Sequence, residues 1–408
     1  MIHTWKKYKL SEIGSVVGGA TPSTNVDTYY NGDIPWLTPK DLSNFHERYI
    51  ERGERNITKS GLNSCSAQLL PAGSVLFSSR APIGYVAIAK NPITTNQGFK
   101  SIIPNPEKVD NLFLYYLLKY NKDNIEAMGS GTTFKEVSGT TMKNIEVYLP
   151  EDLDEQRRIA GILGSLDDKI ELNRRINTNL EAQAQALFRS WFVDFEPFRD
   201  GPFVDSELGK IPQGWKVGTA SEFYKNITIG KTPPRKEHQW FSKNSHDIVW
   251  VSIADMGNCG LSICNSSEYL TPEAIKKFNI CIVPINTVLL SFKLTIGRVA
   301  IADKELATNE AIAHFQTQHN TLEYTYLALK NYEFSSLGST SSIATAVNSK
   351  IIKSMPWMMP SNDVLNQFHN VLSPIFNGIR NNIQEITRLS ALRDTLLPKL
   401  MAGEIAIE

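Results

Sequence analysis

The chain has 408 residues, and its 42 lysine and arginine residues balance 42 aspartate and glutamate residues, so the formal net charge is zero. The length suggests two to three domains, and the balanced charge argues against a simple polycation that coats DNA. No apolar run reaches the roughly 18 residues of a transmembrane helix. Residues 1–10 lack the apolar core of a signal peptide, so we expect a cytoplasmic protein. The four cysteines are scattered and form no Cys-x-x-Cys pair, which indicates reduced thiols rather than a metal cluster or a disulfide framework.

Charge is distributed unevenly along the chain. Residues 1–150 carry a net charge of +3, residues 151–205 of −5, residues 206–360 of +3 and residues 361–408 of −1. Two interpretations stay open. The small excess has arisen by chance, or two nucleic-acid-facing units are carried on a scaffold that does not seek phosphate.

Residues 1–150 predict a first domain of mixed α/β structure. Val75–Phe77 and Val86–Ile88 are apolar or β-branched runs bounded by turns that contain proline and glycine, which predicts short strands. The apolar run Asn111–Tyr120 is more consistent with a helix.

Residues 151–198 predict a long helix. Mostly apolar residues recur at alternating spacings of three and four, as on the seam of a coiled coil. This stripe consists of Leu163, Leu166, Ile170, Asn173, Asn177, Leu180, Ala184, Leu187 and Trp191. At ~1.5 Å per residue it would be about 42 Å long, which corresponds to roughly 12 base pairs of DNA. The alternative is that the stripe packs on its own globular domain.

The aromatic run at residues 190–198 ends this helix at Pro197. It could dock on a partner or pack in a core, and both alternatives stay open. Residues 199–210 are assigned to a linker, and the turn-rich run 206–215 leads into the next domain.

Residues 211–360 repeat the first domain at an offset of 209–214. The ordered matches include Gly19-Ala20-Thr21-Pro22 with Gly230-Lys231-Thr232-Pro233, Trp36 with Trp250, Ile83–Ala89 with Ile296–Ala302, and Thr95-Asn96 with Thr308-Asn309. The apolar run Leu322–Leu329 predicts a second copy of the domain's helix. A period this long indicates a duplicated whole domain rather than a solenoid.

Residues 361–403 predict a second long helix, whose stripe follows the first at a constant offset of 209. Its members are Leu372, Ile375, Ile379, Asn382, Ile386, Leu389, Arg393, Leu396 and Leu400. Asn173 and Asn382 occupy equivalent seam positions, and our hypothesis is that they help to set an antiparallel pairing of the two helices. Pro374 is expected to begin or kink this helix, and Pro398 to perturb its end. The fold class that follows is α+β: two homologous mixed α/β domains separated by two long antiparallel helices, with a pseudo-two-fold internal repeat.

Several short motifs follow one another in order: Gly18–Pro22, Ile34–Leu37, Ser78–Gly84, Asn96–Phe99, Glu155–Ile159, Ser206–Trp215 and Leu392–Met401. In these motifs the chain resembles the specificity subunit of type I restriction–modification systems over nearly its whole length. One departure is that the second copy has Phe292-Lys293 where the first has Ser79-Arg80, and Glu310-Ala311 where the first has Gln97-Gly98.

The resemblance implies two target-recognition domains that each read one half of a bipartite site on double-stranded DNA. It implies that the two helices form the spacer and bind methyltransferase (modification) subunits, and that motor-endonuclease (restriction) subunits join the larger complex. S-adenosylmethionine, ATP and Mg²⁺ would be used by those partners, and no cofactor is expected in this chain. No membrane association is expected.

No catalytic motif appears in the sequence. Gly230-Lys231-Thr232 has the end of a phosphate-binding loop, but Lys225 stands where that motif requires glycine. The seven histidines lack metal-like spacing, and His314 and His319 are interpreted as structural. We therefore expect a non-catalytic DNA-binding subunit. The alternatives are a stand-alone DNA nuclease or methyltransferase with an unrecognised active site, and a scaffold whose duplicated domains bind peptides.

Direct readout of DNA requires polar or cationic side chains on loops that reach base edges or phosphates. In the first domain the candidates are Thr21, Ser23, Lys40, Arg80, Asn96, Gln97, Ser130, Thr132 and Lys135. In the second domain they are Thr232, Arg235, Lys236, Lys293, Arg298, Asn309, Ser339 and Ser341. We expect a third to a half of them to touch DNA and the rest to be solvated turn residues.

Overall fold

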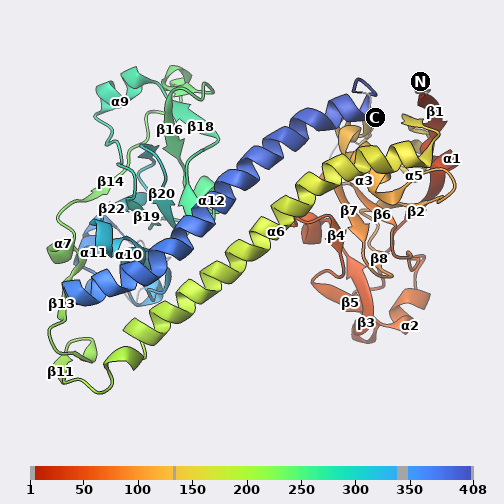
Figure 1. The fold of residues 1–408 in the computed structure, drawn as a ribbon. Helices are drawn as coiled ribbons and strands as arrows, with labels where there is room; N and C mark the ends of the chain where they lie inside the picture. Colours follow the sequence, from red (N-terminus) through yellow and green to blue (C-terminus); the bar gives the residue numbers. More distant parts are fainter. Residues whose placement is uncertain (1–4, 132–134, 338–347, 406–408) are drawn as a thin grey trace. The chain divides into compact units, whose positions relative to one another are not determined.

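The computed structural model of the chain describes residues 5–131, 135–337 and 348–405 (Figure 1). It divides into two compact units. Unit 1 comprises residues up to Arg174 together with those from Glu385 onward, and unit 2 comprises Arg175–Gln384. Each unit therefore contains one α/β domain and a part of each long helix, α6 (Leu153–Phe192) and α12 (Asn362–Met401). Within the described ranges, no helix has the length and apolarity needed to cross a membrane.

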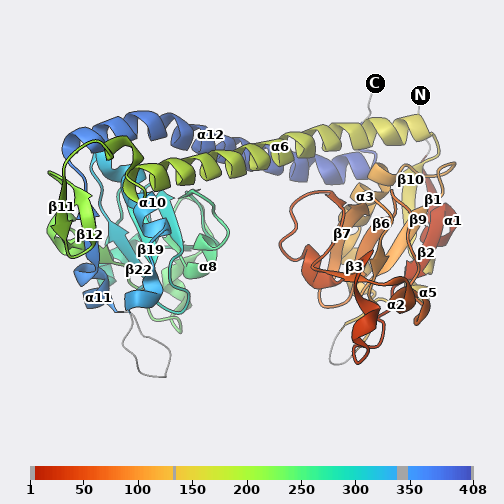
Figure 2. The same ribbon diagram turned by 90° about the horizontal axis from the view of Figure 1, so that it is seen from below.

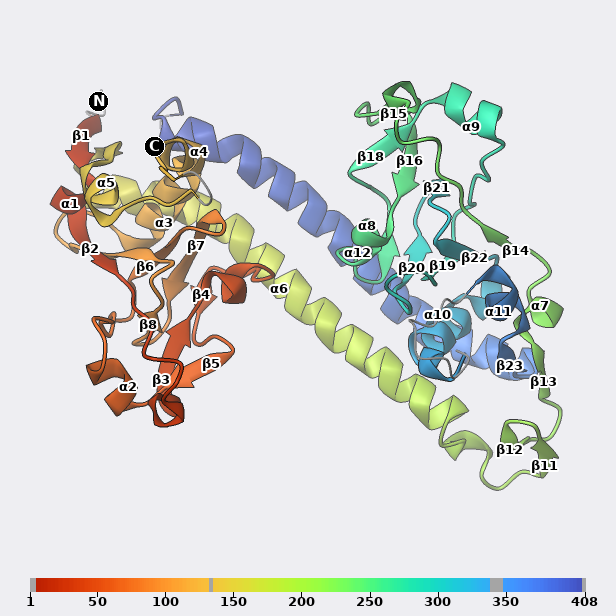
Figure 3. The ribbon, with the colours of Figure 1, turned by 180° about the vertical axis from the view of Figure 1, so that it is seen from behind.

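The domain of unit 1 is built on two sheets. The larger has the strand order β2 (Gly14–Gly18), β9 (Lys100–Pro104), β6 (Val75–Ser79), β7 (Ile83–Ala89) and β4 (Tyr49–Ile50). The smaller has the order β5 (Arg55–Ile57), β3 (Tyr30–Leu37) and β8 (Thr94–Thr95). Strands β1 (Trp5–Lys9) and β10 (Glu146–Pro150) form a separate antiparallel pair. The smaller sheet lies at the end of the domain away from α6 (Figure 3).

Five short helices complete this domain: α1 (Leu10–Ile13), α2 (Lys59–Asn63), α3 (Asn111–Tyr120), α4 (Lys122–Ala127) and α5 (Gly139–Asn144). The sequence correctly predicts α3, which begins because the Asp110 carboxylate accepts hydrogen bonds from the N–H groups of Leu112 and Phe113. Helix α3 lies between the large sheet and α6 (Figure 2). Its residues 113–118 are all buried, so it forms the centre of the core of unit 1.

Unit 2 repeats this topology, except that its smaller sheet has four strands where that of unit 1 has three. Its five-stranded sheet has the order β14 (Ile227–Ile229), β22 (Ile312–Phe315), β19 (Val288–Ser291), β20 (Val299–Ala302) and β17 (Ser262–Ile263). Its smaller sheet has the order β15 (Phe241–Ser242), β18 (Glu268–Leu270), β16 (Ile248–Val251) and β21 (Ala307–Thr308). Strands β13 (Lys216–Thr219) and β23 (Pro356–Met359) correspond to β1 and β10. The predicted duplication is therefore confirmed at the level of sheet topology.

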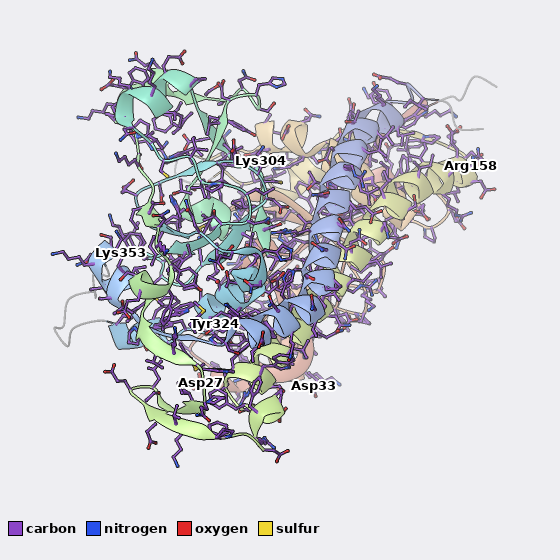
Figure 4. All side chains as sticks on the ribbon, turned by 60° about the vertical axis from the view of Figure 1, so that its left-hand side comes forward. Asp27, Asp33, Arg158, Lys304, Tyr324 and Lys353 are labelled. Atoms are coloured by element: carbon purple, nitrogen blue, oxygen red, sulfur yellow. The ribbon has the colours of Figure 1, made fainter. Side chains whose placement is uncertain are left out.

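The helices of unit 2 follow those of unit 1 in part, since Ile253–Met256 is an α-helix where unit 1 has the 3-10 helix Pro39–Leu42. They are α7 (Ala220–Phe223), α8 (Ile253–Met256), α9 (Pro272–Phe278), α10 (Leu322–Lys330) and α11 (Ser349–Ser354). Helix α10 is the counterpart of α3 and is likewise buried. Tyr324 of α10 lies in the interior of the unit (Figure 4).

The aromatic run after α6 packs in the core of unit 2. The Phe192 and Phe198 rings lie 5.6 and 5.2 Å from the ring of Trp215. The sequence left open whether these residues dock on a partner or pack in a core. In the structure they pack in a core. The segment that follows forms a hairpin of β11 (Phe203–Ser206) and β12 (Gly209–Pro212).

Within each unit, α6 and α12 run antiparallel, because rising residue numbers on one helix meet falling numbers on the other. In unit 1, Arg393 contacts Asp167, with Nη1 2.6 Å from Oδ1, and Glu385 contacts Asn173, with Oε2 2.7 Å from Nδ2. In unit 2, the Asn382 amide donates to the Asn177 carbonyl oxygen at 2.8 Å, and the Trp191 and Phe368 rings are 5.4 Å apart.

The stripe residues of both helices are buried or half-buried, and none is exposed. Arg158, by contrast, points away from the ribbon of α6 (Figure 4). The expectation that Pro374 begins the second helix is wrong, because α12 already begins at Asn362. Leu372 and Phe376, on either side of Pro374, are buried in the core of unit 2, which holds this part of α12 in place although proline supplies no N–H donor.

Candidate nucleic-acid interface

A polar corner forms in unit 1 where the loop after β2 meets the loop between β8 and β9. We call it corner 1 and define it by Thr21, Arg80, Gln97, Lys100 and Glu136. The Ala20 N–H donates to the Thr95 carbonyl at 3.0 Å, which joins the two loops. The Thr21 hydroxyl then donates to the Gln97 side-chain oxygen.

Gly19 is required for this approach of the two loops. A Cβ atom at this position would collide with the backbone carbonyl oxygens of Thr95 and Asn96. Asn96 fixes the second loop from inside, since its Oδ1 accepts the Gly98 N–H at 2.9 Å. The Gly-x-Thr motif and the Asn-Gln motif therefore owe their proximity to backbone contacts that only glycine permits.

Two cations share one carboxylate in corner 1. Lys100 Nζ lies 3.2 Å from Glu136 Oε1, and Arg80 Nη1 lies 3.6 Å from Glu136 Oε2. The backbone of Glu136 also pairs with that of Ser130, through two hydrogen bonds of 2.9 and 3.0 Å. The structure thus brings the candidates Thr21, Arg80, Gln97 and Ser130 together, and Lys135 directly precedes Glu136 in the chain.

Sequence reasoning missed Lys100 and Glu136. The predicted positions match between the two copies of the repeat. Lys100 has no cationic counterpart in the second copy, where Ala313 takes its place in the sheet. The available signal was local: Lys100 lies three residues beyond Gln97, at the start of β9.

The same corner recurs in unit 2, and we call it corner 2, defined by Thr232, Arg235, Lys293 and Glu310. The Lys231 N–H donates to the Thr308 carbonyl at 2.9 Å, and the Thr232 hydroxyl donates to the Glu310 carboxylate. A Cβ atom on Gly230 would collide with Thr308 and Asn309, as at Gly19. The tryptophan of each small sheet completes the match, since Trp36 Nε1 donates to the Ala20 carbonyl at 3.0 Å and Trp250 Nε1 to the Lys231 carbonyl at 3.2 Å.

Corner 2 carries a carboxylate where corner 1 carries a carboxamide. Partial burial raises the pKa of Glu310, but the hydrogen bond from Thr232 and the positive charges of Lys293 and Arg235 outweigh it, so the pKa is lowered overall. Arg235 is held in place, with its guanidinium 4.5 Å from the ring centres of both Phe241 and Trp250 and 2.7 Å from Glu268.

The remaining candidates lie outside the two corners or outside the described residues. Ser23 and Lys236 are exposed, and Lys40 is exposed with Nζ 3.1 Å from Glu54. Arg298 points inward, where its Nη1 donates to the Ile253 carbonyl at 2.6 Å. Asn309 accepts the Ala311 N–H at 3.1 Å, as Asn96 does in unit 1. Thr132, Ser339 and Ser341 lie outside the described residues.

His314 serves packing and hydrogen bonding, as the sequence indicated. His314 is fully buried, and its two ring nitrogens lie 2.9 and 2.7 Å from the hydroxyl oxygens of Thr228 and Thr308. Burial lowers the pKa of His314 to about 4, so the ring is neutral at neutral pH. Across residues 5–131, 135–337 and 348–405, no group of three or more His, Cys, Asp or Glu side chains is arranged to hold a metal ion.

The fold and the two corners define a protein with two homologous α/β domains, each presenting a polar loop cluster, on a pair of antiparallel helices. Comparison with known proteins gives this class its family. The pattern described as "type I restriction modification DNA specificity domain" matches residues 2–182 and 212–389. The chain belongs to this family, as its motifs predicted, and is a specificity subunit that recognises a DNA target through two domains.

Relatives and solved structures agree with this assignment. The chain is 37% identical to the type I restriction enzyme MjaIX specificity subunit of Methanocaldococcus jannaschii, over 99% of this chain and 94% of that protein. It is 24% identical to the type I restriction enzyme HindI specificity subunit of Haemophilus influenzae, over 98% and 99% of the two chains. The crystal structure of the type I restriction–modification S subunit from M. genitalium shares the fold, with a TM-score of 0.59 at 15% identity over 98% and 96% of the two chains.

Proposed function

We propose that each domain reads one half of a bipartite target on double-stranded DNA, with corners 1 and 2 among the reading surfaces. The observation that carries this proposal is that the same loop cluster recurs at matched positions of two equal topologies, but with different side chains. Gln97 is replaced by Glu310, and Arg80 by Lys293. Equal scaffolds with unequal polar groups suit two half-sites of different sequence, since base edges are distinguished by their donor and acceptor patterns.

The test is a selection of bound duplexes from a randomised DNA library by the full chain, followed by competition. Each half of the enriched motif is scrambled separately. We expect each scrambled duplex to compete more weakly than the intact one, and binding to weaken as salt rises because phosphate contacts release counterions. Equal competition by a duplex that lacks one half would contradict the proposal.

We further propose that methyltransferase subunits dock on α6 and α12 and that motor-endonuclease subunits join this complex. Exposed apolar side chains on the helices support this. Ile162 and Val371 occupy equivalent positions of the repeat and are 37% and 45% exposed, although the stripe between the helices is covered. Two matched apolar contacts would suit two copies of one partner.

We assign the chemistry to those partners, so that S-adenosylmethionine, ATP and Mg²⁺ act there and not in this chain. The names of the relatives, all specificity subunits, support this assignment over a stand-alone nuclease or methyltransferase. Incubation of the purified chain with target DNA, Mg²⁺ and S-adenosylmethionine tests it. We expect neither cleavage nor methyl transfer until partner subunits are added, and activity of the chain alone would overturn the assignment.

A further inference from the structure

One apolar side chain of unit 2 is almost completely exposed. Leu294 is 99% exposed, whereas the other exposed large hydrophobic side chains of the described residues range from 37% to 57%. Single exposed leucines are common on proteins and need no explanation. Leu294 differs because its whole side chain projects from the turn between β19 and β20.

Hydrogen bonds hold the backbone of the turn on both sides of Leu294. The Thr295 N–H donates to the Lys293 carbonyl at 2.7 Å, across Leu294, whose φ of 60° lies in the left-handed region that leucine rarely adopts. The Ser291 hydroxyl links the two sides of the turn, because it donates to the Thr295 carbonyl at 2.6 Å and accepts the Arg298 N–H at 3.0 Å.

The equivalent turn of unit 1 has the same serine hydrogen bonds but a small residue at its tip. The Ser78 hydroxyl donates to the Pro82 carbonyl and accepts the Tyr85 N–H, both at 2.8 Å. Ala81 takes the place of Leu294, with a φ of 50°. The exposed leucine is therefore an addition to a shared turn and is not required to form it.

The Leu294 turn adjoins corner 2. Lys293 precedes Leu294 and acts on the Glu310 carboxylate together with Arg235. The Phe292 N–H donates to the Ala311 carbonyl at 2.9 Å, which ties the base of the turn to the loop that carries Glu310. Leu294 is thus an apolar group in a cluster of charged and polar side chains that we assign to DNA.

We propose that Leu294 reads a thymine in the second half-site by contact with its C5-methyl group. This inference rests on the proposed function. The phosphates and sugars beside the corner offer charged and polar partners, and the thymine methyl is the apolar group that base pairs expose in the major groove. The contact would distinguish thymine from the other bases at one position, which Ala81 in unit 1 is too short to do in the same way.

Deoxyuridine tests this contact, because it pairs as thymidine does but lacks the methyl group. Each thymine of the second half-site, in the motif selected by the full chain, is replaced singly by deoxyuridine. For the wild-type chain we expect one replacement to weaken binding by about fourfold, the effect of one buried methyl-sized group. The Leu294→Ala variant should bind more weakly and should bind the thymine and deoxyuridine duplexes equally. The equivalent turn of unit 1 carries alanine, Ala81, at this position.

Leu208→Ala is the matched control, since Leu208 is an exposed leucine (48%) in the β11–β12 turn and should leave the deoxyuridine effect unchanged. Two results would overturn the contact while leaving the proposed function intact: no deoxyuridine effect at any thymine, or an equal effect in wild type and Leu294→Ala. Failure of the wild-type chain to select any motif would instead count against the proposed function itself.

Discussion

Arg80 stands at the edge of corner 1, one-third exposed and paired loosely with Glu136. Its guanidinium can present two parallel donors to a guanine. The backbone bridge between Arg80 and Glu136 fixes the position of the Arg80 main chain. We predict that Arg80→Ala costs about 1–3 kcal/mol of binding free energy and relaxes specificity at one base pair. Repeated DNA selection with the variant measures this.

Lys90→Ala is the charge-matched control for Arg80, because Lys90 is also an ion-paired cation of unit 1 but pairs with Glu51 outside the corner. A loss in Arg80→Ala that is uniform across sequences, with a shallower salt dependence, would assign Arg80 to a phosphate and contradict base readout.

His314 makes the stability of unit 2 depend on pH. Its pKa of about 4 in the folded state lies below the ordinary value of about 6.5, so between these values the unfolded chain binds a proton that the folded chain does not. The free energy of unfolding should therefore fall as the pH is lowered from about 6.5 towards 4, by up to about 1.4 kcal/mol per pH unit.

Urea denaturation at pH 7 and pH 5, for wild type and His314→Gln, checks this prediction. Glutamine keeps a hydrogen-bonding side chain but does not titrate, so the variant should lose the histidine component of the pH slope. Identical slopes for the two proteins would show that His314 does not titrate as proposed.

At the residue scale, comparison of the two copies predicted the site residues whose positions are fixed by backbone contacts in both units. It did not predict site residues that occur in one copy alone. Thr21 with Thr232 and Asn96 with Asn309 could be found because each pair serves the same loop contact in both units. Lys100 and Glu136 could not be found in this way, since their ion pair depends on a contact between β9 and a distant loop of unit 1 alone.

At the scale of elements, the two domains join their helices by different chemistry. In unit 1 the buried Asp167 accepts hydrogen bonds from Tyr116 and Arg393, both at 2.6 Å, and Arg48 pairs with Asp168 and Glu171. The equivalent positions in unit 2 are apolar: Leu327 for Tyr116, Phe376 for Asp167, Ala184 for Arg393 and Leu261 for Arg48. The ionic cluster around Asp167 therefore has an apolar counterpart in unit 2, where α12 forms its ion pair with the domain elsewhere, with Arg380 Nε 3.1 Å from Asp303 Oδ1.

Asp167→Asn should therefore destabilise unit 1 strongly. The substitution removes the charge that Arg393 faces in a buried setting, and loss of one partner of a buried pair costs about 3 kcal/mol. Asp168→Asn is the control, because the Asp168 side chain is 72% exposed and its ion pair should contribute at most about 1 kcal/mol. Chemical denaturation measures both; equal effects would contradict a buried ionic junction.

The seam asparagines give a second prediction at this scale. Asn173 donates to Glu385 and Asn382 to Asn177, so each fixes a polar contact that leucine cannot make. We predict that replacing both with leucine yields a more stable but less uniquely registered helix pair. Denaturation and cysteine cross-linking along α6 and α12 test this; unchanged stability and one unchanged cross-linking register would contradict it.

Elements defined by local periodicity were predictable, and those defined by long-range pairing were not. The stripes on α6 and α12 and the apolar run of α3 follow helical spacing, which the sequence displays directly. Strand β2 pairs with β9 across more than 80 residues, and no local pattern in Gly14–Gly18 selects that partner.

At the scale of the whole molecule, the central feature is the duplication. Strand order, loop contacts and the serine hydrogen bonds of the turn recur in both units. The side chains at the corners and at the helix junctions differ. Sequence matches alone predicted two similar domains; the differences acquire meaning only once the structure places Gln97 opposite Thr21 and Glu310 opposite Thr232. We propose that the two equal scaffolds read half-sites of unequal sequence.

Mapping of methylated bases in the genome of the source organism, compared with the motif that the purified chain selects, tests this account most directly. We predict one motif in both experiments, made of two short specified blocks of different sequence separated by a constant number of unspecified base pairs. A single continuous block, or blocks whose separation varies from site to site, would contradict it.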